Sequence, residues 1–179
     1  MRGVEIGTLH YTSWTLDIGS DRKKYVVYRR WLAHSQKFMH RSNKNAVMAA
    51  FRETLIPGEW IERSEPHPSA AVEEGFREWT EHINRGTLPP RASMAEHVSH
   101  YIEQCCAGRK FATTQRGEPC LVPGESIFGD SILLLGGGKL PFIARPNGDS
   151  YRLIGECFIH GKDLNAIMEG NENRTFTFI

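Results

Sequence analysis

One serine of the chain has neighbours typical of a catalytic nucleophile. Ser131 ends the run Gly129-Asp130-Ser131, in which a glycine and a carboxylate precede the hydroxyl. A serine attacks a carbonyl efficiently only when a base accepts its proton and an acid orients that base. The only histidine after Ser131 is His160, and Cys157, not an acid, stands three residues before it. The sequence around Ser131 therefore lacks the acid and base that this chemistry requires.

The same run resembles the Gly-Asp-Ser block of the GDSL esterases, and this resemblance implies a small hydrolase that uses Ser131. In that family the block lies near the N-terminus, its serine leads into a helix, and an Asp-x-x-His block follows near the C-terminus. Here Ser131 comes late and opens a predicted strand. We expect Gly129-Asp130 to form a turn into a buried strand, and the hydrolase remains an alternative function.

Three further groups of residues have reactive or ligand-binding side chains, but none of them forms a complete catalytic, metal-binding or phosphate-binding motif. His97 and His100 lie one turn apart on a predicted helix, but a zinc site needs a third and a fourth ligand. Gly136-Gly137-Gly138-Lys139 lacks the first glycine and the Ser/Thr of a phosphate-binding loop. The four cysteines form no CxxC pair, and Cys105 and Cys157 fall on predicted apolar faces. We therefore predict no enzyme activity, no cofactor and no metal site.

Glu156 is a carboxylate within a predicted strand that is apolar on both faces. An unpaired buried charge is costly, so this carboxylate needs a partner. Arg145, across a predicted hairpin, and Arg152 are the candidates. We expect an internal ion pair, and a ligand-binding carboxylate is the alternative.

Composition and charge are those of a globular protein with an uneven charge distribution. A chain of 179 residues can bury a sufficient core without disulfides. The net charge is +1, yet residues 1–60 carry ten basic against five acidic side chains, and residues 61–104 carry four against eight. Nucleic-acid binding through residues 22–44 is an alternative function, although basic residues interleaved with helix-type apolar positions argue against it. The sequence lacks a signal peptide and a membrane-length apolar run, which predicts a cytoplasmic protein without a membrane partner.

Helical periodicity dominates the first hundred residues. Four helices are predicted, beginning near Asp21, at Ser42 or Asn43, at Ser69 and at Ser93, where Glu96 completes a capping box. Their apolar stripes consist of Tyr25, Tyr28, Trp31, Leu32, Val47, Phe51, Leu55, Val72, Phe76, Trp79, Ile83, Met94, Val98, Tyr101, Ile102 and Cys105, which are predicted to face the core.

From Arg109 the apolar period changes from 3.6 to 2. Strands are predicted at residues 110–115, 132–135, 140–145, 151–160 and 175–179, with a loop at 116–126 and a hairpin turn at Pro146-Asn147-Gly148-Asp149. The predicted fold class is α+β, with N-terminal helices packed on a small C-terminal antiparallel sheet or barrel. A mainly helical region, 1–107, and a β-rich region, 108–179, are expected to form one compact unit.

A series of motifs runs through the C-terminal part in a fixed order. It comprises Gly129-Asp130-Ser131-Ile132, the stretch from Leu140 to Arg145, and the stretch from Tyr151 to Gly161. These motifs resemble the region that follows the HET domain in fungal heterokaryon-incompatibility proteins. We expect structural roles for the residues that carry the resemblance, which are Gly129, Asp130, Pro141, Arg145, Tyr151, Gly155, Glu156, His160, Gly161, Met168 and Gly170.

The chain departs from that family pattern at several points. Lys162 to Ala166 intervene where the family runs directly from His-Gly to Met-x-Gly-Glu, and Asn171 replaces the final glutamate. No segment of the sequence resembles the HET domain itself. The resemblance therefore implies a non-enzymatic regulatory or interaction module in fungal nonself recognition and cell-death control. Its implied partner is a protein, with a HET-domain protein as the candidate.

Overall fold

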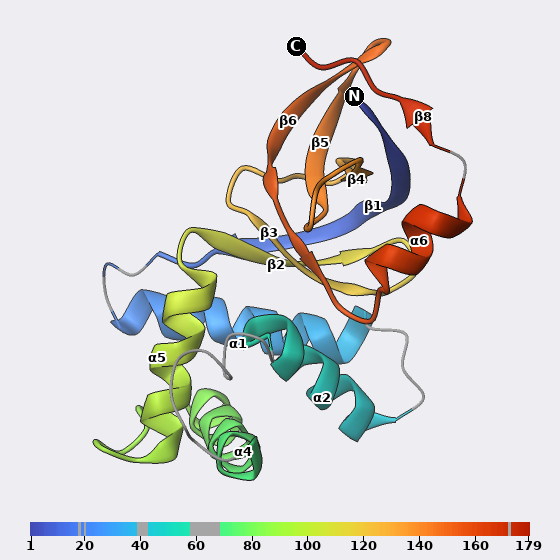
Figure 1. Ribbon diagram of the computed structural model, residues 1–179. Coiled ribbons are helices and arrows are strands. Elements are labelled where there is room, and N and C mark those ends of the chain that lie inside the picture. The colour runs from blue at the N-terminus through green and yellow to red at the C-terminus, as the bar shows by residue number, and fades with distance from the viewer. Residues whose placement is uncertain (18, 20, 39–42, 58–68, 172) are drawn as a thin grey trace.

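A layer of helices lies against one side of a strongly bent sheet (Figure 1). This computed structural model describes residues 1–17, 19, 21–38, 43–57, 69–171 and 173–179. The described helices are α1 (Asp21–Phe38), α2 (Lys44–Leu55), α4 (Ser69–Arg85), α5 (Met94–Cys106) and α6 (Leu164–Gly170). The strands are β1 (Arg2–Thr15), β2 (Arg109–Thr114), β3 (Pro119–Pro123), β4 (Ser131–Leu135), β5 (Phe142–Asn147), β6 (Ser150–Glu156), β7 (Phe158–Ile159) and β8 (Arg174–Thr175).

The predicted placement of the helices before a C-terminal sheet is wrong, because the chain opens with a strand. β1 starts at Arg2 and lies at the centre of an open eight-stranded sheet of order β6-β5-β4-β1-β2-β3-β7, with β8 also pairing to β1. Its first half pairs with β4 and its second half with β2, both antiparallel. Register shifts after Glu5, Leu9 and Thr12 interrupt the alternation of buried and exposed side chains. This interrupted alternation is why period-2 reasoning does not detect the longest strand.

The four predicted helices are confirmed, and two of their caps are the expected ones. The Asn43 side chain accepts a hydrogen bond from the Ala46 amide at 2.8 Å, and the Ser93 hydroxyl accepts one from the Glu96 amide at 3.2 Å. The predicted loop at 116–126 is wrong in part, since it contains strand β3, and α6 was not predicted. The sequence Pro119-Cys120-Leu121-Val122-Pro123 does not indicate a strand, because it contains two prolines and a cysteine. The structure nevertheless places it in a strand whose first four residues are buried.

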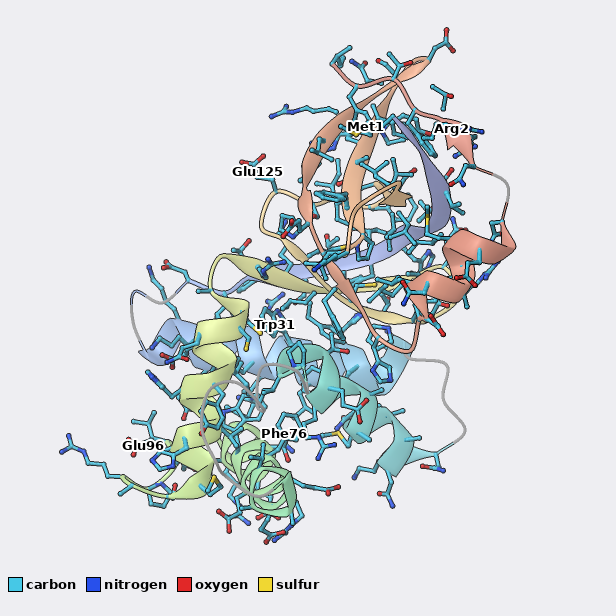
Figure 2. The ribbon with its side chains drawn as sticks, viewed as in Figure 1. Met1, Arg2, Trp31, Phe76, Glu96 and Glu125 are labelled. Atoms are coloured by element: carbon cyan, nitrogen blue, oxygen red, sulfur yellow. The ribbon has the colours of Figure 1, made fainter. Side chains whose placement is uncertain are left out.

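Aromatic rings fill the space between the helices and the sheet. Trp31, Phe51 and Trp79 are fully buried together with Phe111 of β2. The Phe51 and Phe111 rings meet edge to face, with centroids 5.1 Å apart. Figure 2 shows Trp31 and Phe76 within this helical layer. The β2–β3 part of the sheet therefore forms one wall of the helical core and holds α1 alongside β1.

Candidate functional site: the 124–130 loop

A partly buried ion pair joins Asp130, the residue before β4, to Arg145 of strand β5. The Asp130 side chain is only 1% exposed, and its two carboxylate oxygens accept hydrogen bonds from the Arg145 guanidinium, Nε to Oδ1 at 2.8 Å and Nη2 to Oδ2 at 3.1 Å. Such a bidentate pair fixes orientation as well as charge. The hydrogen bonds to Asp130 raise the pKa of Arg145 above its ordinary value.

The same ion pair holds the backbone of the loop formed by residues 124–130. Asp130 Oδ2 accepts the Ile127 amide at 2.9 Å, and Arg145 donates to the Glu125 carbonyl at 2.8 Å. The Lys110 ammonium donates to the Ser126 carbonyl at 3.0 Å. These hydrogen bonds reach three consecutive loop residues from three different side chains.

The end of the loop is tied to β1. The Gly129 amide donates to the Leu9 carbonyl at 2.9 Å, and the Leu9 amide donates to the Asp130 carbonyl at 2.9 Å. Gly129 adopts a φ of 86°, a left-handed conformation that glycine tolerates without strain. The predicted turn at Gly129-Asp130 leading into a buried strand is confirmed, because every residue of β4 is buried.

The 124–130 loop carries two large apolar side chains into solvent. Ile127 is 47% exposed and Phe128 is 67% exposed. The Phe128 ring lies 6.0 Å from the His10 ring of β1. Figure 2 shows Glu125, in the same loop, at the margin of the molecule. A fixed loop that presents adjacent apolar side chains is suited to protein contact, because little conformational entropy remains to be lost on binding.

Ser131 makes a different contact from the one a hydrolase would need. Its side chain is nearly buried, and its hydroxyl donates to Glu5 Oε1 at 2.8 Å. The Nδ1 atom of His160 lies 3.3 Å from a carboxylate oxygen of Glu53 on α2. The serine hydroxyl thus faces a carboxylate, and the histidine faces a second carboxylate on another element.

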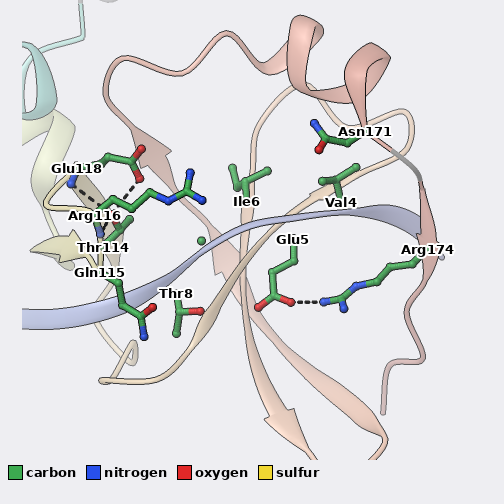
Figure 3. A pocket seen from close by; sticks show the side chains of 11 residues that line it. Val4, Glu5, Ile6, Thr8, Thr114, Gln115, Arg116, Glu118, Asn171 and Arg174 are labelled. Atoms are coloured by element: carbon green, nitrogen blue, oxygen red, sulfur yellow. Dashed lines mark hydrogen bonds and ion pairs between the residues drawn. The ribbon is translucent and has the colours of Figure 1, made fainter.

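Glu5 lies in an open groove of about 420 Å³ between β1, the β2–β3 turn and the segment after α6 (Figure 3). Figure 3 shows Arg174 reaching Glu5 from one side of the groove, where the two form an ion pair. At the other side, Glu118 accepts from the Thr114 hydroxyl at 2.9 Å and pairs with Lys162. The two carboxylates that line the groove are thus each paired with a cation.

The prediction that Glu156 forms an internal ion pair is wrong. Glu156 is exposed, Arg145 is paired with Asp130, and the Glu156 backbone carbonyl accepts from Arg109 at 3.0 Å. β6 is an edge strand, so a carboxylate on it reaches water without a partner. Gly155, with a φ of 156°, interrupts the strand where the β5–β6 register shifts, and this explains why alternation misplaces Glu156.

The remaining residues that carry the family resemblance are spread over the sheet and α6. The Tyr151 ring contacts Phe176 at 5.4 Å, and the Pro141 carbonyl accepts the Cys157 amide at 2.9 Å. Gly161 adopts a φ of 74°, Met168 packs against the core of the sheet, and Gly170 ends α6. Of the resembling residues, Gly129, Asp130 and Arg145 are brought together at the 124–130 loop.

Neither the thiols nor the paired histidines assemble a site. Burial raises the pKa of Cys105 to about 11 and that of Cys157 to about 12, so both thiols stay protonated near neutrality. His97 and His100 are exposed on α5, with the His100 Nε2 atom 2.7 Å from the Gln104 amide nitrogen. In the part of the chain that the structure describes, no three His, Cys, Asp or Glu side chains are grouped to hold a metal ion.

Sequence reasoning missed a second exposed feature, at the contact between β1 and α1. Tyr11 and Trp14 project from β1 against His34 and Arg30 of α1. Two patterns in the sequence indicate this feature. Tyr11 and Trp14 are aromatic residues three positions apart, and the helix that follows them carries regularly spaced basic residues. Period-2 reasoning does not detect the feature, because register shifts interrupt the alternation along β1.

Comparison with protein-family models, with curated proteins and with solved structures finds no match to this chain. The resemblance to heterokaryon-incompatibility proteins therefore stays a prediction carried by the motif residues. No helix among the described residues combines the length and apolar character needed to cross a membrane.

Proposed function

We propose that the chain is a non-enzymatic interaction module that binds a protein partner through the 124–130 loop. The observation that carries this proposal is the exposure of Ile127 and Phe128 on a loop whose backbone is held by the partly buried Asp130–Arg145 pair. Large apolar side chains on a preorganised loop bind with a small entropic penalty. Flexible surface loops usually carry polar residues, so this arrangement favours a contact surface.

The family resemblance supplies the partner class for this proposal. Asp130 and Arg145, which carry part of the resemblance, are the two residues that hold the loop. This coincidence supports a role for the motif in maintaining a contact surface. The proposed partner is a HET-domain protein, and the proposed setting is fungal nonself recognition and cell-death control in the cytoplasm.

Co-purification from fungal cells tests the proposal. The tagged chain is compared with Phe128→Ser and with a matched control, Leu153→Ser, which alters an exposed leucine on the edge strand β6. We expect a HET-domain protein to be recovered with the wild type and the control, and to be lost with Phe128→Ser. Absence of a HET-domain protein from the wild-type sample, or equal recovery with all three chains, would overturn the proposal.

An ester-hydrolysis assay separates this function from the hydrolase alternative. The wild type is compared with Ser131→Ala on short-chain ester substrates. We expect equal background rates, since the Ser131 hydroxyl donates to Glu5. Turnover that disappears in Ser131→Ala would contradict the non-enzymatic assignment.

A further inference from the structure

Three basic side chains form one row along α1. Lys23, Arg30 and Lys37 are exposed and spaced seven residues apart. Seven residues make nearly two helical turns, so these side chains lie on one line at intervals of about 10.5 Å. The apolar residues between them, including Tyr28 and Trp31, point into the core. In the sequence, the alternation of basic and apolar residues argues against nucleic-acid binding. In the folded helix, the same alternation places the apolar residues in the core and the basic residues on one exposed face.

Two aromatic side chains of β1 lie beside this row. The Arg30 guanidinium sits over the Trp14 ring, 3.4 Å from its centroid. The Tyr11 ring stacks on His34, with centroids 3.7 Å apart and an interplanar angle of 14°. Arg30 and His34 are one turn apart on α1, so both rings contact the same side of the helix. We call Tyr11, Trp14, Lys23, Arg30 and Lys37 the aromatic–basic face.

Both rings keep substantial exposed surface. Trp14 is 50% exposed and Tyr11 is 36% exposed, although α1 covers part of each ring. The two residues are three positions apart on a strand, about 10 Å along its axis. Planar surface therefore remains available at two neighbouring points beside the basic row.

The described side chains that α1 contributes to this face are basic or uncharged. The exposed side chains described between residues 23 and 37 of α1 are Lys23, Val26, Arg29, Arg30, Ala33, Gln36 and Lys37, which include no acid. The Lys24 ammonium points elsewhere and pairs with Glu103 of α5 at 3.0 Å. The face thus places cations, which attract an anionic ligand, beside flat aromatic rings. These rings can stack on planar groups of the same ligand.

We propose that the aromatic–basic face binds single-stranded nucleic acid, with bases stacking on Trp14 and Tyr11 and phosphates lying along the Lys23–Arg30–Lys37 row. Stacking requires unpaired bases, which excludes a duplex as the preferred ligand. An acidic peptide matches the cations but supplies no planar groups for both rings. This activity uses other residues than the protein contact of the 124–130 loop and does not depend on it.

Fluorescence anisotropy with a labelled fifteen-nucleotide oligo(dT) or oligo(U) tests the proposal on the full chain. With three cations engaged, we expect the logarithm of the affinity to fall with the logarithm of the salt concentration with a slope of about −2. Trp14→Ala should weaken binding by about 5- to 150-fold, which is the range expected for one lost stack. Trp14→Phe should restore most of the affinity, because a phenyl ring also stacks.

Matched variants separate stacking from nonspecific charge. Lys23→Gln should reduce the salt slope by about 0.7, whereas Lys139→Gln, an exposed cation next to β4, should leave the affinity and the slope unchanged. Phe128→Ser should also leave oligonucleotide binding unchanged, so a failed protein contact and a failed nucleic-acid site give different results. No binding, equal binding of duplex and single strand, or binding insensitive to both Trp14→Ala and Lys23→Gln would overturn the proposal. Competition by poly(glutamate) as effective as that by unlabelled oligo(dT) would also overturn it.

Discussion

The 124–130 loop and the aromatic–basic face both leave large apolar side chains in solvent, but different interactions hold them. A bidentate ion pair with a buried carboxylate, together with hydrogen bonds to consecutive backbone groups, fixes the loop. Stacked rings and one cation–π contact hold the face. Removing the cation that pairs with a buried carboxylate leaves an unsatisfied charge, whereas removing one exposed stacking partner leaves only a smaller contact. The two regions should therefore differ in their sensitivity to mutation, pH and salt.

The largest effect is expected from Arg145→Ala. The substitution leaves the Asp130 carboxylate, 1% exposed, without its cation and should lower the free energy of unfolding by about 3–5 kcal/mol. Urea denaturation followed by circular dichroism measures this change. The double variant Asp130→Ala/Arg145→Ala should recover part of the loss, since no buried charge remains. A loss below about 1 kcal/mol in the single variant would show that the pair does not hold the loop.

Acid should destabilise the α1–β1 contact through His34. Burial lowers the pKa of His34 to about 4, while the unfolded chain titrates near 6.5. Because the unfolded state binds the proton more readily, this contribution to stability is complete above pH 6.5 and is lost as the pH falls toward 4. The loss should reach about 2–3 kcal/mol by pH 4.

His34→Phe is the control for this pH dependence. Phenylalanine keeps a ring against Tyr11 but cannot titrate, so the slope of unfolding free energy between pH 6.5 and 4.5 should become flatter. It removes the contact of His34 with the Thr113 hydroxyl at 3.1 Å, so the slope, not the absolute stability, is the relevant readout. An unchanged slope would contradict the assignment of this titration to His34.

A smaller effect is expected from Arg30→Ala. Trp14 is half exposed, and an exposed cation–π contact contributes about 0.5–1 kcal/mol. Thermal melts should therefore show a small decrease for Arg30→Ala and a smaller one for Arg30→Lys. A loss as large as that of Arg145→Ala would remove the contrast between the two regions.

The smallest effect is expected from Glu156→Ala. The side chain is exposed on the edge strand β6, so its removal should change the free energy of unfolding by less than about 0.5 kcal/mol. Urea denaturation beside Arg145→Ala provides the comparison. A loss of several kcal/mol would mean that Glu156 has the buried role that the sequence predicts.

Local signals in the sequence identify the helical layer well. The stripes that contain Trp31, Phe51 and Trp79 have the helical period, and Ser93 with Glu96 marks a helix start. Each of these signals lies within a few residues of the element that it predicts. The placement of helices before the sheet is a wrong prediction, because β1 has an irregular period and its partners, β2 and β4, follow about a hundred residues later.

The candidate sites depend on contacts that no local pattern contains. The sequence predicts a pair between Arg145 and Glu156 across the β5–β6 hairpin, but the register places Phe142 opposite Glu156. The sheet places Arg145 beside Asp130. Likewise, the stacking of Tyr11 on His34 requires α1 to run alongside β1. Motif residues could be predicted, whereas their partners follow from the register of distant strands and the packing of the helical layer.

Isothermal titration of the purified chain with a purified HET-domain partner tests the central claim most directly. Truncating an exposed aromatic anchor at the centre of a contact weakens binding by 2 kcal/mol or more, which is about 30-fold. We predict that Phe128→Ser weakens binding by at least that factor while Leu153→Ser stays within about twofold of the wild type. Equal affinities for the wild type and Phe128→Ser would show that the 124–130 loop is not the contact.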